Sequence, residues 1–468
     1  MVGSPFSWVG SNNALFQSLK QEIQMLPSRM RLNKALQMPS LSVMNFLNEV
    51  KINYPNAISF SAGRPAEAFF EVNDRMAAID TFMQHFQEAT ALSETAAWGN
   101  FGQYGKTNGL ICDLLADHLA KDEGMQVKAE DIVVTTGCQE AMVLVLMGLF
   151  SEPGDVLLTA DPTYIGITGM ARLLNIDVEP VPCGEAGLDL DALEKTVRHC
   201  KARGRTPKAV YVIPDFNNPI GCDMPLAQRQ ALLDMASRHD FWVFEDNPYG
   251  MFVYDGAPLP TLKSMDSEGR VIYMGTFSKT LFPSLRVGYL ATDAMIEDEA
   301  GSATPLSQSL SKIKSLTTVN TCAISQAIVG GILLQQDGQL KAHAQGLIDH
   351  YRQRRDGMLH ALATAFPEGD PIRAQLHWNQ PRGGFFMTVT LPFTFDEEVL
   401  SECARDFGVI VVPMSYFSLT PGREHQIRLS FCSNTLEEIE TGIASLADFI
   451  RIKARVQSGA GVSTNTRS

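Results

Sequence analysis

One segment of the sequence places a lysine where covalent chemistry is expected. In Gly275-Thr276-Phe277-Ser278-Lys279 the lysine closely follows the apolar run Val271 to Met274. A lysine at such a point is costly to bury unless its pKa falls or its amine is covalently engaged. Lys279 is therefore a candidate for a Schiff base with a carbonyl group. A surface lysine is the simpler alternative from this segment alone, and a serine-hydrolase Ser-x-x-Lys motif is disfavoured because Thr276 replaces the serine.

Three further polar segments follow apolar runs, and each offers a different group. They are Thr135 to Glu140, Pro214 to Gly221 and Glu245 to Gly250. The first leads into a helix, where free backbone N–H groups beside Gly137 suit an anionic phosphate. The second carries the amide of Asn218, and the third carries Asp246, whose position after a buried run requires a positively charged partner. A helix cap or an ordinary Asn-Pro turn would explain each segment taken alone.

Taken together, the four segments contain the groups that one cofactor requires. Pyridoxal phosphate needs a phosphate site, a donor to its phenolic oxygen, a carboxylate for its pyridine nitrogen and a lysine for its aldehyde. No Gly-x-Gly-x-x-Gly follows a predicted strand, so a dinucleotide site lacks its main sequence signal. The order of the segments therefore predicts a pyridoxal-phosphate site, and no metal site is expected.

The elements that must position these groups form an α/β pattern. Short β-branched runs alternate with amphipathic stretches from about residue 106 to 290, which predicts a large, mostly parallel sheet of about seven strands with helices on both faces. Ligands bind outside the carboxyl ends of such strands. A long helical pattern over Thr321 to Leu362 follows, and then a smaller α+β pattern. We expect an N-terminal arm at 1–57, a small domain at 58–90 and 336–453, a large cofactor-binding domain at 91–335, and a mobile tail at 454–468.

Length and composition exclude several classes of protein. The chain has 468 residues, 45% of them hydrophobic and 19% charged, which predicts a folded globular protein. Its formal charge of −14 disfavours nucleic acid as a partner. No apolar run approaches the ~20 residues of a membrane helix, so no membrane is expected. Eight scattered cysteines without a Cys-x-x-Cys pair, and no visible secretory signal, favour the cytoplasm.

Several motifs together resemble a known family. They are Ser61-Ala62-Gly63-Arg64-Pro65, Gln103-Tyr104-Gly105, Gly137-Cys138-Gln139, Asp161-Pro162-Thr163-Tyr164, Asn218-Pro219, Asp246-Asn247-Pro248-Tyr249, Ser278-Lys279, Pro381-Arg382-Gly383-Gly384-Phe385-Phe386 and Ile427-Arg428-Leu429-Ser430. From about Ile58 to Ile450 the sequence resembles the class I/II aminotransferases, which are fold-type I pyridoxal-phosphate enzymes. The likeness is to the branch with α-aminoadipate/kynurenine and valine–pyruvate aminotransferases. The resemblance implies a homodimeric transaminase acting on an amino acid and a 2-oxo acid.

The resemblance also implies roles for individual residues in binding the cofactor. Lys279 would form the internal aldimine and then act as the proton shuttle, while Asp246 would keep the pyridine nitrogen protonated. Asn218 and Tyr249 would hydrogen-bond the phenolic oxygen, and Tyr164 would stack on the ring. The phosphate would be surrounded by Gly137, Cys138, Gln139, Thr276, Ser278 and Arg286, with Tyr104 reaching it from the neighbouring subunit.

Substrate recognition is implied for two further arginines, Arg428 and Arg64. Arg428 would bind the α-carboxylate in a bidentate fork. Arg64, beside Gly63, would face the distal end of the substrate and select a second anionic group, and Asn218 would also face the substrate. A solvated Arg64, or one that merely supports the turn, is the alternative.

Some residues depart from the family pattern, and the reaction itself stays open at this point. Cys138 stands where relatives usually have serine, and Asn217 and Ile220 alter the usual turn around Asn218. The segment from Met44 to Glu49, followed by Tyr54-Pro55 and Gly63-Arg64-Pro65, resembles aminotransferase-like enzymes that make unusual amino acids for peptide natural products, which implies such a role here. β- or γ-elimination/replacement and carbon–carbon bond formation use the same cofactor residues and remain alternatives. A cofactor-binding transcription regulator would need a basic domain that the first 57 residues do not provide.

Overall fold

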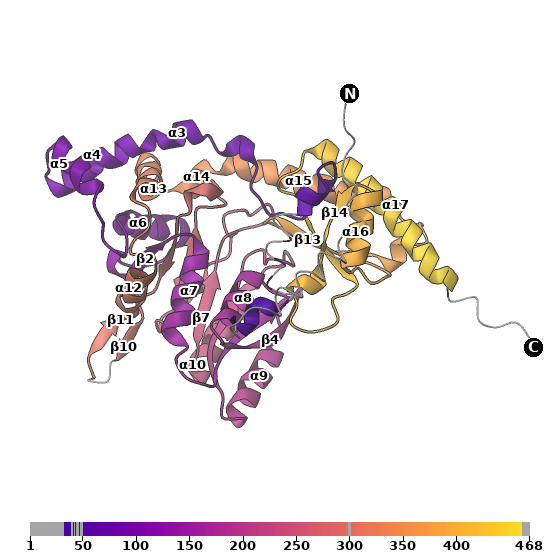
Figure 1. Cartoon of the computed structure of the whole chain (residues 1–468), viewed down its shortest axis with the longest axis horizontal. Helices are drawn as coiled ribbons and strands as arrows, with labels where there is room; N and C mark the ends of the chain where they lie inside the picture. The colour runs from indigo at the N-terminus through magenta and orange to yellow at the C-terminus, as the bar shows by residue number, and fades with distance from the viewer. Residues whose placement is uncertain are drawn as a thin grey trace, which may run out of the picture.

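The computed structural model describes residues 32–38, Leu41, Val43, Phe46, 50–297 and 301–460. Most of the predicted N-terminal arm and the last eight residues of the predicted tail lie outside this part. Figure 1 shows a large sheet with its helices and, beside it, a smaller α+β region from the C-terminal third of the chain. Within the described residues, no helix has the length and apolar character needed to cross a membrane.

The large sheet has eight strands in the order β2-β9-β8-β7-β6-β3-β4-β5. Their bounds are β2 (Ile132–Thr135), β3 (Asp155–Asp161), β4 (Asp177–Gly184), β5 (Gly187–Leu188), β6 (Thr206–Val212), β7 (Trp242–Asp246), β8 (Val271–Thr276) and β9 (Gly288–Ala291). The central pairs β4/β3, β3/β6, β6/β7 and β7/β8 are parallel, whereas β9 runs antiparallel to both β8 and β2. The mostly parallel sheet predicted from the sequence is confirmed, and the short hairpin strand β5 brings it to eight strands.

Both faces of this sheet are covered, which explains why its strands are apolar runs rather than alternating patterns. Leu157 faces the core that contains α7 (Cys138–Leu149) and α8 (Ile165–Leu173). Its neighbours Val156 and Leu158 face the opposite core, with α9 (Leu190–Ala202) and α10 (Leu226–His239). Further helices, α4 (Ala78–Thr90), α6 (Cys112–Glu123) and α13 (Ala323–Gln335), pack around the β2 end of the sheet.

The smaller region contains an antiparallel sheet in the order β12-β13-β16-β15. The strands are β12 (His377–Trp378), β13 (Phe386–Thr390), β15 (Val412–Pro413) and β16 (Gln426–Ser430), packed with α15 (Gln345–Ala365), α16 (Glu397–Asp406) and α17 (Leu436–Ala460). An early segment joins this region, because β1 (Ile58–Ser59) pairs in parallel with β14 (Val409–Ile410). The chain therefore crosses from the small region to the large one and back.

Two helical stretches differ from the sequence prediction. The long pattern over Thr321 to Leu362 is divided into α13, α14 (Leu340–His343) and α15. The first break falls at Asp337 and Gly338, whose φ angles of 47° and 72° are incompatible with a continuing right-handed helix. In addition, α17 continues to Ala460 and Ala454 packs against the core, so the first part of the predicted tail is helical.

Candidate active site

A cavity of about 270 Å³ lies at the carboxyl ends of the central strands, between the large and small regions. It is lined by Gly63, Arg64, Cys138, Gln139, Tyr164, Asn218, Asp246, Tyr249, Thr276, Ser278, Lys279, Arg286 and Arg428, among others. Every site residue predicted from the sequence is in this set except Gly137 and Tyr104. Gly137 is nevertheless adjacent, because a Cβ atom there would lie 2.3 Å from Arg286 Nη2. Tyr104 is 84% exposed and stands outside the cavity.

Lys279 follows β8 and extends into the cavity. Its Nζ donates a hydrogen bond to the carbonyl oxygen of Gly63 at 2.7 Å. Burial lowers the pKa of this amine, and the nearby guanidinium groups of Arg286 and Arg428 add to the effect. A lysine with a lowered pKa holds more of the neutral amine that attacks a carbonyl.

Asp246 is the last residue of β7, and its carboxylate is buried at the floor of the cavity. Tyr211 Oη donates to Asp246 Oδ2 at 2.5 Å, while Oδ1 has no hydrogen-bond partner among the described residues. Burial raises the pKa of Asp246 to about 6, against the lowering effect of hydrogen bonds from Tyr211 and Cys138. A buried carboxylate oxygen without a partner fits the protonated ring nitrogen of pyridoxal phosphate.

Arg428 on β16 stands across the cavity between two aromatic rings. Its guanidinium carbon lies 4.4 Å from the ring centre of Phe386 and 4.5 Å from that of Phe417. Nη1 donates to Asn218 Oδ1 at 2.8 Å, and Nη2 donates to the carbonyl oxygen of Ser61. Burial lowers the pKa of Arg428 to about 10, and its Nε has no partner among the described residues. The fixed guanidinium is suited to a carboxylate, and Asn218 keeps its amide NH₂ for a second acceptor.

The phosphate cradle is built where β2 turns into α7. Gly137 has a φ of 73° and precedes α7, which has no side-chain cap, so the backbone N–H groups of Cys138 and Gln139 are placed to bind an anion. Arg286 Nη1 lies 3.3 Å from Ser278 Oγ, which in turn accepts from Thr276 Oγ1 at 3.1 Å. Two hydroxyls, one guanidinium and a helix N-terminus together fit a phosphate dianion.

A buried ion pair between Glu140 and Lys314, which was not predicted from the sequence, supports the turn that forms the phosphate cradle. Glu140, in the first turn of α7, accepts a hydrogen bond from the backbone N–H of Thr136 at 2.6 Å. Its carboxylate also accepts from Lys314 Nζ, at 2.8 and 3.0 Å, and from Thr318 Oγ1 at 2.6 Å. Lys314 is fully buried on α12 (Leu306–Thr317), so this helix fixes the turn that carries Cys138 and Gln139.

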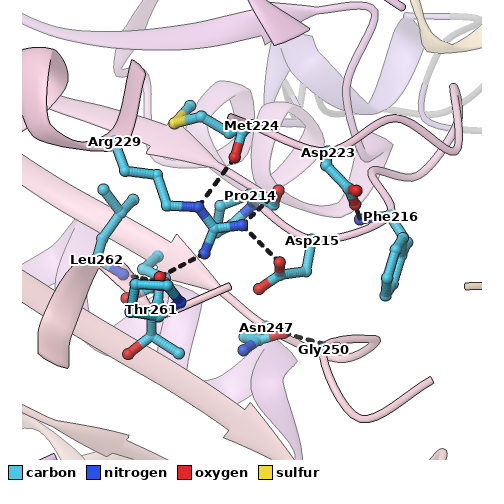
Figure 2. Close-up of polar contacts among 12 residues, drawn as sticks. Pro214, Asp215, Phe216, Asp223, Met224, Arg229, Asn247, Gly250, Thr261 and Leu262 are labelled. Carbon is cyan, nitrogen blue, oxygen red and sulfur yellow. Dashed lines mark hydrogen bonds and ion pairs between the residues drawn. The ribbon is translucent and has the colours of Figure 1, made fainter. Parts of the chain in front are cut away.

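Arg229 supports the loop that carries Asn218. Figure 2 shows its guanidinium inside a ring of acceptors, although it is a residue of the amphipathic helix α10. It donates to the carbonyl oxygens of Met224 (3.0 Å), Pro214 (3.2 Å) and Pro260 (2.8 Å), and it pairs with Asp215 Oδ1 at 2.5 Å. The exposed fraction of Arg229 is 0%, and the buried Asp215 carboxylate has it as its cationic partner.

Replacing Arg229 with methionine is expected to lower the free energy of unfolding by about 3–5 kcal/mol. The variant keeps the apolar stem but leaves the Asp215 carboxylate buried without its cation. Denaturant unfolding of the apoprotein measures the loss. Arg238→Met on the same helix removes an exposed arginine and should cost less than about 0.5 kcal/mol. A loss below 1 kcal/mol in Arg229→Met would show that the loop carrying Asn218 does not depend on Arg229 for its stability.

Comparison with known proteins assigns the family. The model of the aminotransferase class I and II family matches residues 75–446. The chain therefore belongs to this family, and it is a pyridoxal-phosphate-dependent transaminase of fold type I. Of the reactions open at the sequence level, transamination is the one that family membership supports, rather than elimination/replacement or carbon–carbon bond formation.

Individual relatives cover nearly the whole chain. One is the (S)-3,5-dihydroxyphenylglycine transaminase of Amycolatopsis orientalis, 40% identical over 427 residues, which are 91% of this chain and 94% of the relative. The structure of Pyrococcus horikoshii kynurenine aminotransferase, determined with PMP, kynurenine and its product, aligns with a TM-score of 0.77 at 30% identity and covers 93% of this chain and 99% of that chain. The α-aminoadipate aminotransferase LysN of Thermus thermophilus, complexed with N-(5'-phosphopyridoxyl)-L-leucine, aligns with a TM-score of 0.74 at 28% identity, covering 91% and 98% of the two chains.

Proposed function

We propose that this transaminase moves the amino group between an amino acid with an aryl side chain and a 2-oxo acid. The observation that carries the proposal is the apolar and aromatic part of the cavity wall. It is formed by Met142, Ile165, Ile213, Phe386 and Phe417. Such a wall suits a flat apolar ring, and the transaminase of Amycolatopsis orientalis is named for an aryl amino acid. The relation to that enzyme also supports a role in making an unusual amino acid.

Different site residues bind the cofactor, transfer the proton and orient the substrate. Bound pyridoxal phosphate supplies an electron sink for the charge that develops at the substrate α-carbon. Lys279 Nζ holds the cofactor and then moves the proton that leaves the α-carbon. Asp246 would balance the charge of a protonated ring nitrogen, and the Asn218 amide and Tyr249 hydroxyl would donate to the phenolic oxygen. Arg428 binds the α-carboxylate and so orients the α-hydrogen toward Lys279.

A substrate panel tests the aryl preference. The holoenzyme is mixed with (S)-phenylglycines bearing ring hydroxyls, phenylalanine, leucine and alanine, and the conversion of the cofactor to its amine form is followed by absorbance. Mass analysis then identifies the keto acid. We expect aryl substrates to exceed alanine about 10–200-fold in kcat/KM, as burial of a large apolar group allows. Equal values for aryl and small aliphatic substrates would contradict the proposal.

A second substrate class, amino acids with an acidic side chain, is favoured by Arg64. This residue lines the cavity next to Gly63, whose carbonyl oxygen contacts Lys279. A guanidinium at that point adds a forked donor for a distal carboxylate or phosphate.

Arg64→Ala is therefore expected to lower kcat/KM for 2-aminoadipate, which corresponds to a rise of about 1.5–3 kcal/mol in activation free energy. The kcat/KM for leucine should stay nearly unchanged. The loss reflects one charge-assisted bond between Arg64 and the distal carboxylate. Steady-state kinetics on both substrates measures it. Equal losses for the acidic and the neutral substrate would mean that Arg64 only supports the turn.

The active unit is proposed to be a homodimer. Tyr104, Leu316 and Ile324 are large side chains that are 84%, 89% and 55% exposed. Their segments adjoin, because a Cβ atom on Gly105 would lie 3.6 Å from the Asn320 side chain. A second copy of the chain covering this surface would bury these groups and bring Tyr104 toward the partner's phosphate cradle.

Sedimentation of the holoenzyme is expected to give twice the chain mass of 51.4 kDa. Leu316→Asp should shift the species toward the monomer and lower activity, because a charge is costly to bury at an interface. Leu226→Asp, an exposed leucine on α10, serves as the control. A fully active monomer would contradict the dimer.

The cytoplasm is the proposed location. All eight cysteines lie in the described residues and all are free thiols. Persistent free thiols are typical of a reducing compartment.

A further inference from the structure

The hydroxyl of Tyr211 is placed against the carboxylate of Asp246 by the register of the sheet. Strands β6 and β7 are parallel, and Tyr211 is paired with Phe244. Asp246 lies two residues beyond Phe244, so its side chain is on the same face of the sheet as Tyr211. Tyr211 is fully buried, and its Oη donates to Asp246 Oδ2 at 2.5 Å. That bond leaves Oδ1 as the carboxylate oxygen without a partner among the described residues.

The other groups around this carboxylate do not replace the bond. Asp246 is surrounded by titratable or charged side chains of several elements, namely Tyr211 on β6, Cys138 on α7, Tyr164 before α8, Tyr249 after β7, and Lys279 and Arg286 after β8. The Cys138 thiol is a weak donor and also lies 3.3 Å from the carbonyl oxygen of Gly275. The Tyr164 hydroxyl accepts from Gln139 Nε2 at 2.7 Å. Tyr211 therefore supplies the strongest neutral donor to Asp246.

We infer that Tyr211 is a positioning residue that fixes the Asp246 carboxylate and keeps it ionised for the ring nitrogen of the cofactor. The inference rests on the role proposed for Asp246. A tyrosine hydroxyl favours the charged form of a carboxylate because it donates and carries no proton that the carboxylate can readily take. Burial raises the pKa of Tyr211 well above its ordinary value, so the hydroxyl remains a donor across the working range of pH.

The electrostatic balance at Asp246 shows what the hydroxyl contributes. Burial alone favours the protonated acid and raises its pKa, and the hydrogen bond from Tyr211 is the largest opposing influence. Without this donor, the carboxylate would accept a proton at higher pH. A neutral acid cannot balance a protonated ring nitrogen, so the ring would lose its proton more readily.

The test follows the ring nitrogen itself rather than turnover. Wild-type and Tyr211→Phe holoenzymes are loaded with pyridoxal phosphate labelled with ¹⁵N in the ring, and the ¹⁵N chemical shift is recorded from pH 6 to 10. In the variant we expect the ring proton to be lost at a pH about one to two units lower, the effect of removing one hydrogen bond to a charged group. Tyr211→3-fluorotyrosine, a stronger donor, should move the midpoint in the opposite direction.

Tyr273→Phe is the matched control. It removes a buried hydroxyl from β8, the strand next to β7, and that hydroxyl has no hydrogen bond to Asp246 among the described residues. Its nitrogen titration should coincide with that of the wild type, even where its thermal unfolding changes. An unchanged titration in Tyr211→Phe, or shifts of the same sign in both Tyr211 variants, would overturn the inference. A wild-type nitrogen without a proton across the whole range would instead overturn the role of Asp246 and, with it, the role of Tyr211.

Discussion

Replacing Lys279 with alanine is expected to abolish covalent attachment of the cofactor and to lower turnover by at least about 10²–10⁴-fold, the share of a positioned proton-transfer group. Lys279 Nζ contacts the carbonyl oxygen of Gly63 in the cavity, and no other lysine among the described residues lines the cavity. Borohydride reduction followed by peptide mass analysis shows whether the cofactor is fixed, and stopped-flow absorbance gives the rate.

Two controls separate loss of the amine from damage to the fold. Lys279→Arg keeps a positive charge but lacks a primary amine, so it should fail in the same way. Lys312→Ala removes an exposed lysine of α12 and should behave as the wild type. Cofactor still fixed by borohydride to the peptide that spans position 279 in Lys279→Ala would remove Lys279 from its assigned role.

Replacing Asp246 with alanine is expected to slow removal of the substrate α-proton about 10²–10³-fold, the loss typical for one preorganised electrostatic group. Cofactor affinity should fall much less, because the phosphate cradle and Lys279 remain. Deuterium exchange at the α-carbon measures proton removal, and equilibrium dialysis of the cofactor measures affinity. Asp240→Ala, at the exposed end of α10, is the control. Normal exchange in Asp246→Ala would exclude this carboxylate from the reaction.

The site residues that could be predicted from the sequence lie where an apolar strand ends and polar residues begin. β2 ends at Thr135, β7 at Asp246 and β8 at Thr276, and in each case the apolar run gives way to a polar group. Because parallel strands bring their carboxyl ends to one edge, separate positions along the chain converge on one cavity. The prediction therefore needed only strand ends and residue types, with the family resemblance supplying individual roles.

The residues that the sequence did not predict are hidden inside regular elements. Tyr211 lies within an apolar strand, where an aromatic residue is typical of packing. Arg229 lies in an amphipathic helix, where an arginine is usually exposed. Their side-chain partners, Asp246 for Tyr211 and Asp215 for Arg229, are 35 and 14 residues away, so no local spacing indicates them. The break in the long helical pattern did carry a local signal, since Asp337-Gly338 is a common turn pair.

The pairing of β1 with β14 sets an order of events during synthesis of the chain. The segment that follows β1 provides the Ser61 carbonyl oxygen to Arg428, a contact between residues 367 positions apart. At roughly 5–20 residues per second on the ribosome, about 20–75 s pass between the appearance of one partner and the other. The large sheet, complete by Ala291, can form well before then. The substrate side of the cavity is thus the last part to be built, and a nascent chain cannot orient an amino acid until its final strands have emerged.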